Sequence, residues 1–246
     1  MRIFFIGSQR TRRKYLLICV YLLCLLILVS VIKIVLPVSK AITVQGCLPL
    51  ANKTIVLDPG HGGYDPGVRN NNVEEKNIVL AIALQLRDYL QASGARVVMT
   101  RETDTDLLVQ PTAGPKKQED MRNRMQIVEA ADPDIFLSIH ANAIGSAQWR
   151  GAQVFHKIEH QQSIILAQAL QQELVRVLGN TDRVIKPGNY FVLNETERCA
   201  ALVECGFISN PEEAQLLTDP AYQNKVAWAL YLGLIHYYAQ PPAVVD

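Results

Sequence analysis

Three apolar segments that each lead into a polar, chemically capable residue limit what this chain can fold into. The segments cover residues 54–57, 134–142 and 200–204. Apolar runs of this length, bounded by turn residues, are typical of strands that are buried on both faces of a sheet. The first leads into His61, the second carries His140 near its end, and the third ends in Glu204. Because α/β proteins place their sites at the carboxyl ends of strands, these side chains are expected to meet at one edge of a sheet.

Amphipathic segments alternate with the strands along the chain. Helices are expected at residues 75–92, 118–131, 163–178, 211–218 and 221–238. Further strands are expected at residues 96–100, 151–156 and 190–193. This alternation predicts a single three-layer α/β domain, with a mixed, mostly parallel sheet of about six strands and helices on both faces.

A possible metal site involves both strand-end histidines. His61 lies in a run of glycines, which let the backbone approach a ligand closely. Glu75 opens a helix, where the helix dipole favours a carboxylate, and Glu74 is its rival for the same role. With His140 the set is His-Glu-His, the ligand count of a catalytic zinc site that leaves a fourth position for water. Taken singly, each histidine is more often a core or loop residue, and it is the shared strand-end context that favours metal binding.

Glu204 is the candidate general acid and base. A buried strand that delivers a carboxylate at its end is suited to proton transfer. The alternative is a structural glutamate paired with an arginine. Asp58 is expected to orient the first histidine or cap its turn. Asn142 and Asn210 either contact substrate or stabilise turns, and Tyr190 is expected to line the groove.

At these residues the chain resembles a known family. The motifs are DPGHGG at 58–63, a glutamate before a lysine at a helix start, SIHAN at 138–142 and VECGFISN at 203–210. They occur in this order in zinc-dependent N-acetylmuramoyl-L-alanine amidases of the amidase_3 type, and the resemblance covers about residues 53–239. It implies one Zn²⁺ ion, with His61, Glu75 and His140 as ligands and Glu204 as the catalytic residue.

The family's ligand glutamate directly precedes a lysine, which favours Glu75, before Lys76, over Glu74. Asn77 stands where the family often has aspartate, a departure that does not touch the ligand set. WRGAQVF at 149–155 and NTDR at 180–183 are similar to the germination-specific amidases of spore-forming bacteria.

The resemblance implies a peptidoglycan hydrolase that cuts the amide between N-acetylmuramic acid and L-alanine, in spore cortex maturation or in wall remodelling. Two alternatives stay open: a zinc peptidase on a similar scaffold, and a catalytically inactive wall-binding module. Some relatives carry an inhibitory helix before the last glutamate. Here the interval 141–203 is filled by regular elements, so an open groove and control from outside the domain, including a protein activator, are expected.

The N-terminal segment is expected to lead the chain out of the cytoplasm. Residues 1–14 are basic, and residues 15–36 form an apolar run long enough for a transmembrane signal-anchor. A linker at 37–52, the catalytic domain at 53–240 and a tail at 241–246 would follow outside. The alternative is cleavage after residues 39–41 and secretion.

Charge and motif argue against a nucleic-acid-binding protein and against a phosphate-binding loop. The net charge is only +1, and much of the positive charge precedes the apolar run, so no basic stripe is left for nucleic acid. The glycine-rich turn lacks the lysine and hydroxyl ending of a phosphate-binding loop, and no helix follows it directly.

Overall fold

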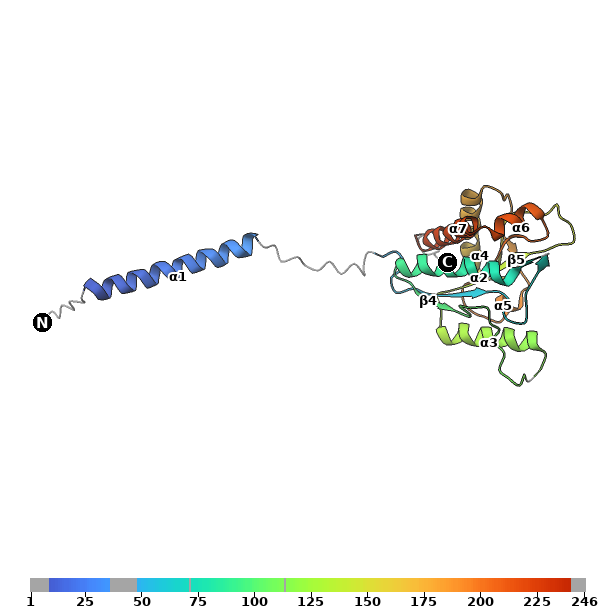
Figure 1. Ribbon diagram of the computed structural model, residues 1–246, viewed down its shortest axis with the longest axis horizontal. Coiled ribbons are helices and arrows are strands. Elements are labelled where there is room, and N and C mark those ends of the chain that lie inside the picture. Colours follow the sequence, from blue (N-terminus) through green and yellow to red (C-terminus); the bar gives the residue numbers. More distant parts are fainter. Residues whose placement is uncertain (1–8, 36–47, 71, 113, 240–246) are drawn as a thin grey trace. The chain divides into compact units, whose positions relative to one another are not determined.

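The structure is a computed structural model of the chain (Figure 1), and it describes all residues except 1–8, 36–47, 71, 113 and 240–246. The side chains of residues 9–12 and 27–35 also lie outside the described part. The chain divides into two units, Met1–Val44 and Gln45–Asp246. All strands that the structure describes belong to the second unit.

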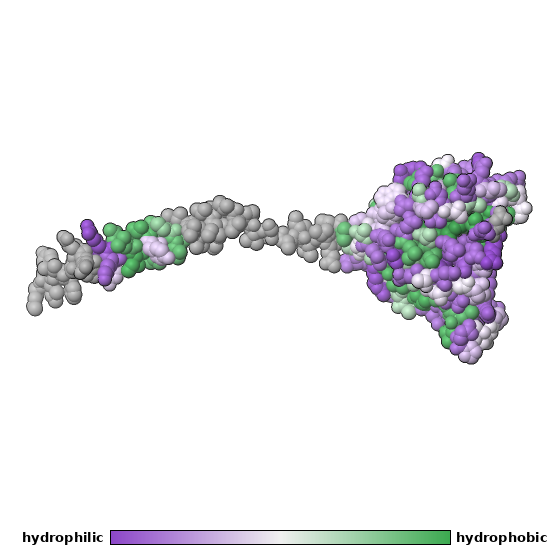
Figure 2. Space-filling model, viewed as in Figure 1, coloured by the Kyte–Doolittle hydropathy of each residue, from purple (hydrophilic) through white to green (hydrophobic). Residues whose placement is uncertain are grey.

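The first unit contributes helix α1, Gln9–Val35. Its described side chains, residues 13–26, are exposed and mostly apolar, as Figure 2 shows. The expected anchor at 15–36 falls partly outside the described residues, as do the basic segment 1–14 and the linker 37–52, and the tail 241–246 lies wholly outside them. Among the residues that are described, no helix combines the length and the apolar character needed to cross a membrane.

The second unit is built on a six-stranded sheet with the order β4-β1-β5-β8-β6-β7. The strands are β1 Thr54–Pro59, β4 Arg96–Met99, β5 Ile135–Asn142, β6 Gln153–His156, β7 Lys186–Pro187 and β8 Ala200–Phe207. β4, β1, β5 and β8 run parallel, whereas β6 is antiparallel to β8. The predicted mixed sheet of six strands is therefore confirmed.

Helices cover both faces of this sheet (Figure 1). α2 (Glu75–Ala92), α4 (Gln161–Leu178) and α7 (Pro220–Ala239) pack together on one face, with α6 (Pro211–Thr218) beside α7; α3 (Lys116–Ala131) lies on the other. Side chains along β1 alternate between the two cores: Ile55 and Leu57 belong to the larger, and Val56 to the smaller. Because both faces are covered, β5 and β8 are buried along almost their whole length, as the apolar runs predict.

One predicted strand is wrong. Residues 190–193 belong to a helical turn, α5 (Phe191–Asn194), in which two following N–H groups donate to the carbonyl of Tyr190. The sixth strand is β7 instead. A short apolar run has no periodicity that separates a strand from a buried turn of helix. A small antiparallel ribbon that sequence reasoning missed, β2 (Arg69–Asn70) with β3 (Val73–Glu74), leads directly into α2.

Candidate metal centre

The turn after β1 brings His61 toward the end of β5. His61 has φ of 60°, a left-handed conformation that is uncommon for residues with a side chain. Gly60 permits a close approach to His140, since a Cβ added to this glycine would lie 2.2 Å from the ring atom Cε1 of that histidine. The two imidazole rings lie edge to face, with their centroids 5.1 Å apart.

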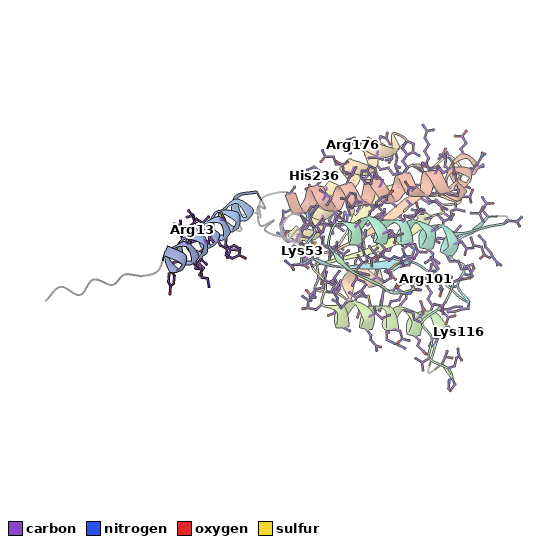
Figure 3. The ribbon with its side chains drawn as sticks, turned by 60° about the vertical axis from the view of Figure 1, so that its left-hand side comes forward. Arg13, Lys53, Arg101, Lys116, Arg176 and His236 are labelled. Atoms are coloured by element: carbon purple, nitrogen blue, oxygen red, sulfur yellow. The ribbon has the colours of Figure 1, made fainter. Side chains whose placement is uncertain are left out.

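Two buried arginines hold the backbone of this turn. Arg101, which Figure 3 labels, donates to the carbonyl oxygens of Pro59 and Gly60 at 2.9 and 2.7 Å. Arg124 donates to the carbonyl of Pro59 at 3.0 Å and also to that of His61. Each carbonyl along the turn therefore has a charged donor, which fixes the direction in which the histidine leaves the backbone.

Asp58 holds Arg124 in place. This carboxylate is 1% exposed and accepts hydrogen bonds from Arg124 at 2.8 Å, from Thr100 at 2.7 Å and from Ser138 at 2.8 Å. Burial raises the pKa of Asp58, but the charge of Arg124 and these hydrogen bonds outweigh burial and lower it. The sequence predicts that Asp58 orients His61. It acts on that histidine only by holding Arg124, because the carboxylate itself is hydrogen bonded to other groups.

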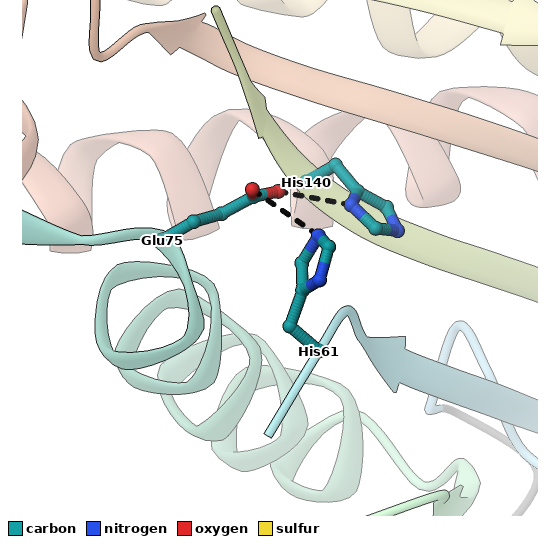
Figure 4. Close-up of side chains that lie close together, drawn as sticks. All are labelled: His61, Glu75 and His140. Carbon is teal, nitrogen blue, oxygen red and sulfur yellow. Dashed lines mark hydrogen bonds and ion pairs between the residues drawn. The ribbon is translucent and has the colours of Figure 1, made fainter. Parts of the chain in front are cut away.

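Glu75 lies between the two histidines (Figure 4). Its Oε2 is 3.1 Å from Nε2 of His61, and its Oε1 is 2.9 Å from Nδ1 of His140. The backbone N–H groups of Val68 and Ala141 donate to the two carboxylate oxygens at 2.9 and 3.0 Å. One nitrogen or oxygen from each of the three side chains lies within 4.8 Å of the others. The structure thus brings together all three predicted ligand residues, and Glu75 comes from the first turn of α2.

The charge state of this group suits a divalent cation. Burial raises the pKa of Glu75, yet the hydrogen bonds and charges of His140 and His61 dominate and hold it well below its ordinary value. Glu74, the rival candidate, points elsewhere and pairs with Arg69 on the β2-β3 ribbon. An ionised carboxylate beside two imidazole nitrogens is a typical zinc ligand set, so the residues fit the metal that the sequence predicts.

Asp65 orients His61, a role that sequence reasoning did not assign. Its Oδ2 lies 2.8 Å from Nδ1 of His61, and its Oδ1 accepts from the N–H of Gly67 at 3.0 Å. Holding Nδ1 in this way leaves Nε2 directed at Glu75. Carboxylates commonly fix the tautomer of a ligand histidine from behind. The available signal was a second Asp-Pro-Gly turn, residues 65–67, four residues after the histidine.

Glu204 lies directly opposite His140 in the pairing of β8 with β5. Its side chain is 8% exposed, and Oε2 has no hydrogen-bond partner among the described residues. Burial raises the pKa of Glu204 to about 7, with opposing effects from His140 and Glu75. Among the described residues no arginine forms an ion pair with Glu204, which argues against the alternative of a structural glutamate.

Two cavities meet at the histidines. One of about 190 Å³ lies between α3, α5 and β8, and its walls include Met121, Val192 and Leu202. Another of about 370 Å³ is bordered by residues 141–143 and Gly67. His61, His140 and Glu204 line both cavities, so a substrate in either one reaches the same chemical groups.

The remaining candidate residues differ in position: two line the cavities and one caps a helix. Tyr190 lines the first cavity and Asn142 the second, so both lie beside the His-Glu-His group. Asn210 instead caps α6, because its side-chain oxygen accepts from the N–H groups of Glu212 and Glu213 at 3.0 and 3.2 Å. This asparagine therefore stabilises a turn.

Comparisons with known proteins agree on one family. Residues 55–236 match the family described as N-acetylmuramoyl-L-alanine amidase. The germination-specific N-acetylmuramoyl-L-alanine amidase of Bacillus subtilis (strain 168) is 45% identical over 197 residues, which cover 78% of this chain and 83% of that protein. The CwlD amidase of Clostridioides difficile, solved in complex with the GerS lipoprotein, has 41% identity and a TM-score of 0.73, covering 76% of this chain and 98% of that one. The catalytic domain of CwlV, an N-acetylmuramoyl-L-alanine amidase from Bacillus (Paenibacillus) polymyxa, has 32% identity and a TM-score of 0.67, covering 75% and 97%.

Proposed function

This chain belongs to the N-acetylmuramoyl-L-alanine amidases, and we propose that it hydrolyses the amide bond between N-acetylmuramic acid and L-alanine in peptidoglycan. The observation that carries the proposal is the buried Glu204, whose Oε2 has no hydrogen-bond partner among the described residues, beside a His-Glu-His group at the edge of the sheet. Acyl transfer from an amide to water needs an activated water and a proton for the departing amine, and these residues can serve both needs.

In this proposal His61, Glu75 and His140 hold one zinc ion. When bound, zinc polarises the amide carbonyl and makes a water molecule acidic near neutral pH. Glu204 accepts the proton that the attacking water loses and donates it to the amine of L-alanine as the carbon–nitrogen bond breaks. Asp65 keeps the proton on Nδ1 of His61, so that Nε2 stays free to act as a ligand.

The test is digestion of purified peptidoglycan by the full chain, with products identified by mass spectrometry. The expected products are glycan strands with a free lactyl carboxyl group and peptides with a free N-terminal alanine. Glu204→Gln should keep its zinc and lose about 10²–10⁴-fold in turnover. Glu195→Gln, a change at an exposed glutamate, serves as the matched control and should remain active.

Other products would indicate the two alternatives. Release of free amino acids would indicate a zinc peptidase, and binding to peptidoglycan without any cleavage would indicate a wall-binding module. Normal turnover by Glu204→Gln would leave Glu204 with a structural role only, even if the amidase activity itself is present.

We further propose spore cortex peptidoglycan as the substrate, with a partner protein that controls the enzyme. Support comes from the similarity to a germination-specific amidase and to a relative solved together with a lipoprotein. The open groove expected from the sequence would place control outside the domain. Digestion of cortex and of vegetative peptidoglycan, with and without a candidate partner, tests this proposal. Equal rates on both substrates, unchanged by any partner, would contradict it.

The N-terminal anchor at residues 15–36 remains a proposal from the sequence. In this proposal the catalytic domain at 53–240 lies on the outer side of the membrane. It is secreted if the chain is cleaved after residues 39–41. Fractionation of cells that express the full chain, combined with mass spectrometry of its N-terminus, separates the two forms. An intact N-terminus that fractionates away from membranes would refute the anchor.

A further inference from the structure

An exposed lysine borders both cavities of the metal centre. Lys117 is an exposed residue near the start of α3, and it lines the cavity of about 190 Å³ and the cavity of about 370 Å³. Both cavities also contain His61, His140 and Glu204. A molecule bound at the reacting groups therefore lies within reach of this ammonium, whichever cavity it fills.

The other positive charge that lines a cavity is already neutralised. Arg124 pairs with Asp58 at 2.8 Å and with Asp120 at 2.7 Å, and it donates two further hydrogen bonds to the backbone carbonyls of Pro59 and His61. The charge of Lys117 acts on Asp65, but the two oxygens of that carboxylate are already hydrogen bonded, one to His61 and one to the N–H of Gly67. Among the described residues, Lys117 forms no ion pair.

Local stability does not account for the lysine. Lys116 and Lys117 are the first two residues of α3, where the positive end of the helix dipole disfavours a cation. Lys116, labelled in Figure 3, has a structural contact, because its ammonium lies 5.5 Å from the centre of the Tyr64 ring. Lys117 has no ion pair or ring contact among the described residues, so its ammonium is available to an anion that comes from outside the chain.

We propose that Lys117 is a specificity residue that binds a free carboxylate on the peptide that follows L-alanine in the substrate. This inference rests on the proposed amidase function, which places a peptide on the leaving side of the scissile amide. A lysine ammonium on a flexible stem suits a single carboxylate whose direction of approach is not fixed. Neutral peptides, with the carboxylate converted to an amide, would lose this contact.

The experiment compares two soluble muropeptides that differ only in whether that carboxylate is free or amidated. The full chain, Lys117→Met, Lys117→Arg and the neighbouring control Lys116→Met are assayed on both. For Lys117→Met, KM on the acidic substrate should rise about three- to tenfold with kcat unchanged, and KM on the amidated substrate should not change. Lys117→Arg should keep most of the preference for the acidic substrate, and Lys116→Met should keep all of it. The effect should shrink at high salt, because an exposed ion pair is screened.

Three other results would contradict the proposal. Equal KM values for the two substrates in the unmodified chain would overturn the proposal, as would an equal effect of Lys117→Met on both. A fall in kcat or in zinc content in Lys117→Met would show instead that the lysine supports the histidine turn. Affinity of both muropeptides for Glu204→Gln, with and without the lysine change, is measured by calorimetry. The carboxylate preference can then be read even if turnover, and with it the amidase proposal, fails.

Discussion

Replacing Arg124 by methionine tests the view that buried charges under the histidine turn hold the metal centre together. Methionine keeps much of the volume of the arginine stem and removes the guanidinium. The change leaves two buried carboxylates, Asp58 and Asp120, without their cation, at 1% and 7% exposure. It also removes one donor from the carbonyl of Pro59 and one from that of His61.

The expected cost is large for a single substitution. Removing one partner from a buried ion pair typically costs about 3–5 kcal/mol, because the remaining charge stays buried. Domains of this kind are stable by about 5–15 kcal/mol in total. With a urea dependence of about 2 kcal/mol per molar, the unfolding midpoint of Arg124→Met should fall by about 1.5–2.5 M. Arg122→Met, a change at an exposed arginine of the same helix, is the control and should shift the midpoint little.

The difference between the two proteins should also depend on pH. In the intact protein the pKa of Asp58 is lowered, because Arg124 and the hydrogen bonds from Thr100 and Ser138 outweigh burial. A lowered folded-state pKa contributes stability above the unfolded value of about 3.9, and that stability is lost as the pH falls through the folded value. In Arg124→Met the largest charge that opposes burial is gone, and only the hydrogen bonds from Thr100 and Ser138 and the charge of His140 remain, so Asp58 binds a proton more readily. The stability gap should therefore be widest near pH 7 and narrow toward about pH 4.

Urea unfolding followed by circular dichroism at several pH values measures this gap directly. A loss below about 1 kcal/mol, no larger than that of the control, would refute the reasoning. So would a gap that stays constant between neutral and acidic pH.

Four further substitutions test the metal centre itself, each with zinc content measured by mass spectrometry and the fold checked by circular dichroism. Asp65→Asn should weaken zinc binding about 10–100-fold, because the ligand histidine loses the carboxylate that orients it, and unchanged affinity would remove that role. Gly60→Ala should also lose zinc, because the added methyl group would lie 2.2 Å from the His140 ring; full zinc retention would mean that the turn can move aside. Glu75→Ala should lose zinc whereas Glu74→Ala should keep it, and the reverse result would exchange the two roles.

The parts of the site that can be predicted from the sequence are those that depend on local sequence patterns. His140 lies near the end of β5, as its apolar run predicts, whereas β8 continues for three residues past Glu204, which the sequence places at the end of its strand. Glu75 could be separated from Glu74 only by family resemblance, because the choice depends on where the helix begins. In the structure Glu74 closes the β2-β3 ribbon and Glu75 opens α2, and that single step decides which carboxylate is buried.

The parts that escaped prediction depend on contacts between distant segments. Arg124 supports a turn that lies more than sixty positions earlier in the sequence, and nothing near this arginine indicates that its side chain is buried. The helical turn at 191–194 is a short apolar run whose conformation is set by packing beside α3 and β8. Local propensity is a weak guide for such segments, since tertiary contacts override it.

The left-handed backbone at His61 shows that local preference does not decide the conformation of this turn. An L-residue in that conformation costs about 1–2 kcal/mol that glycine would not. Glycine at this position would relieve that strain, but it would also leave the buried Glu75, and Asp65 behind the ring, without their histidine partner. The contacts that aim the side chain at Glu75 therefore also hold its backbone, and the conformation and the site stand or fall together.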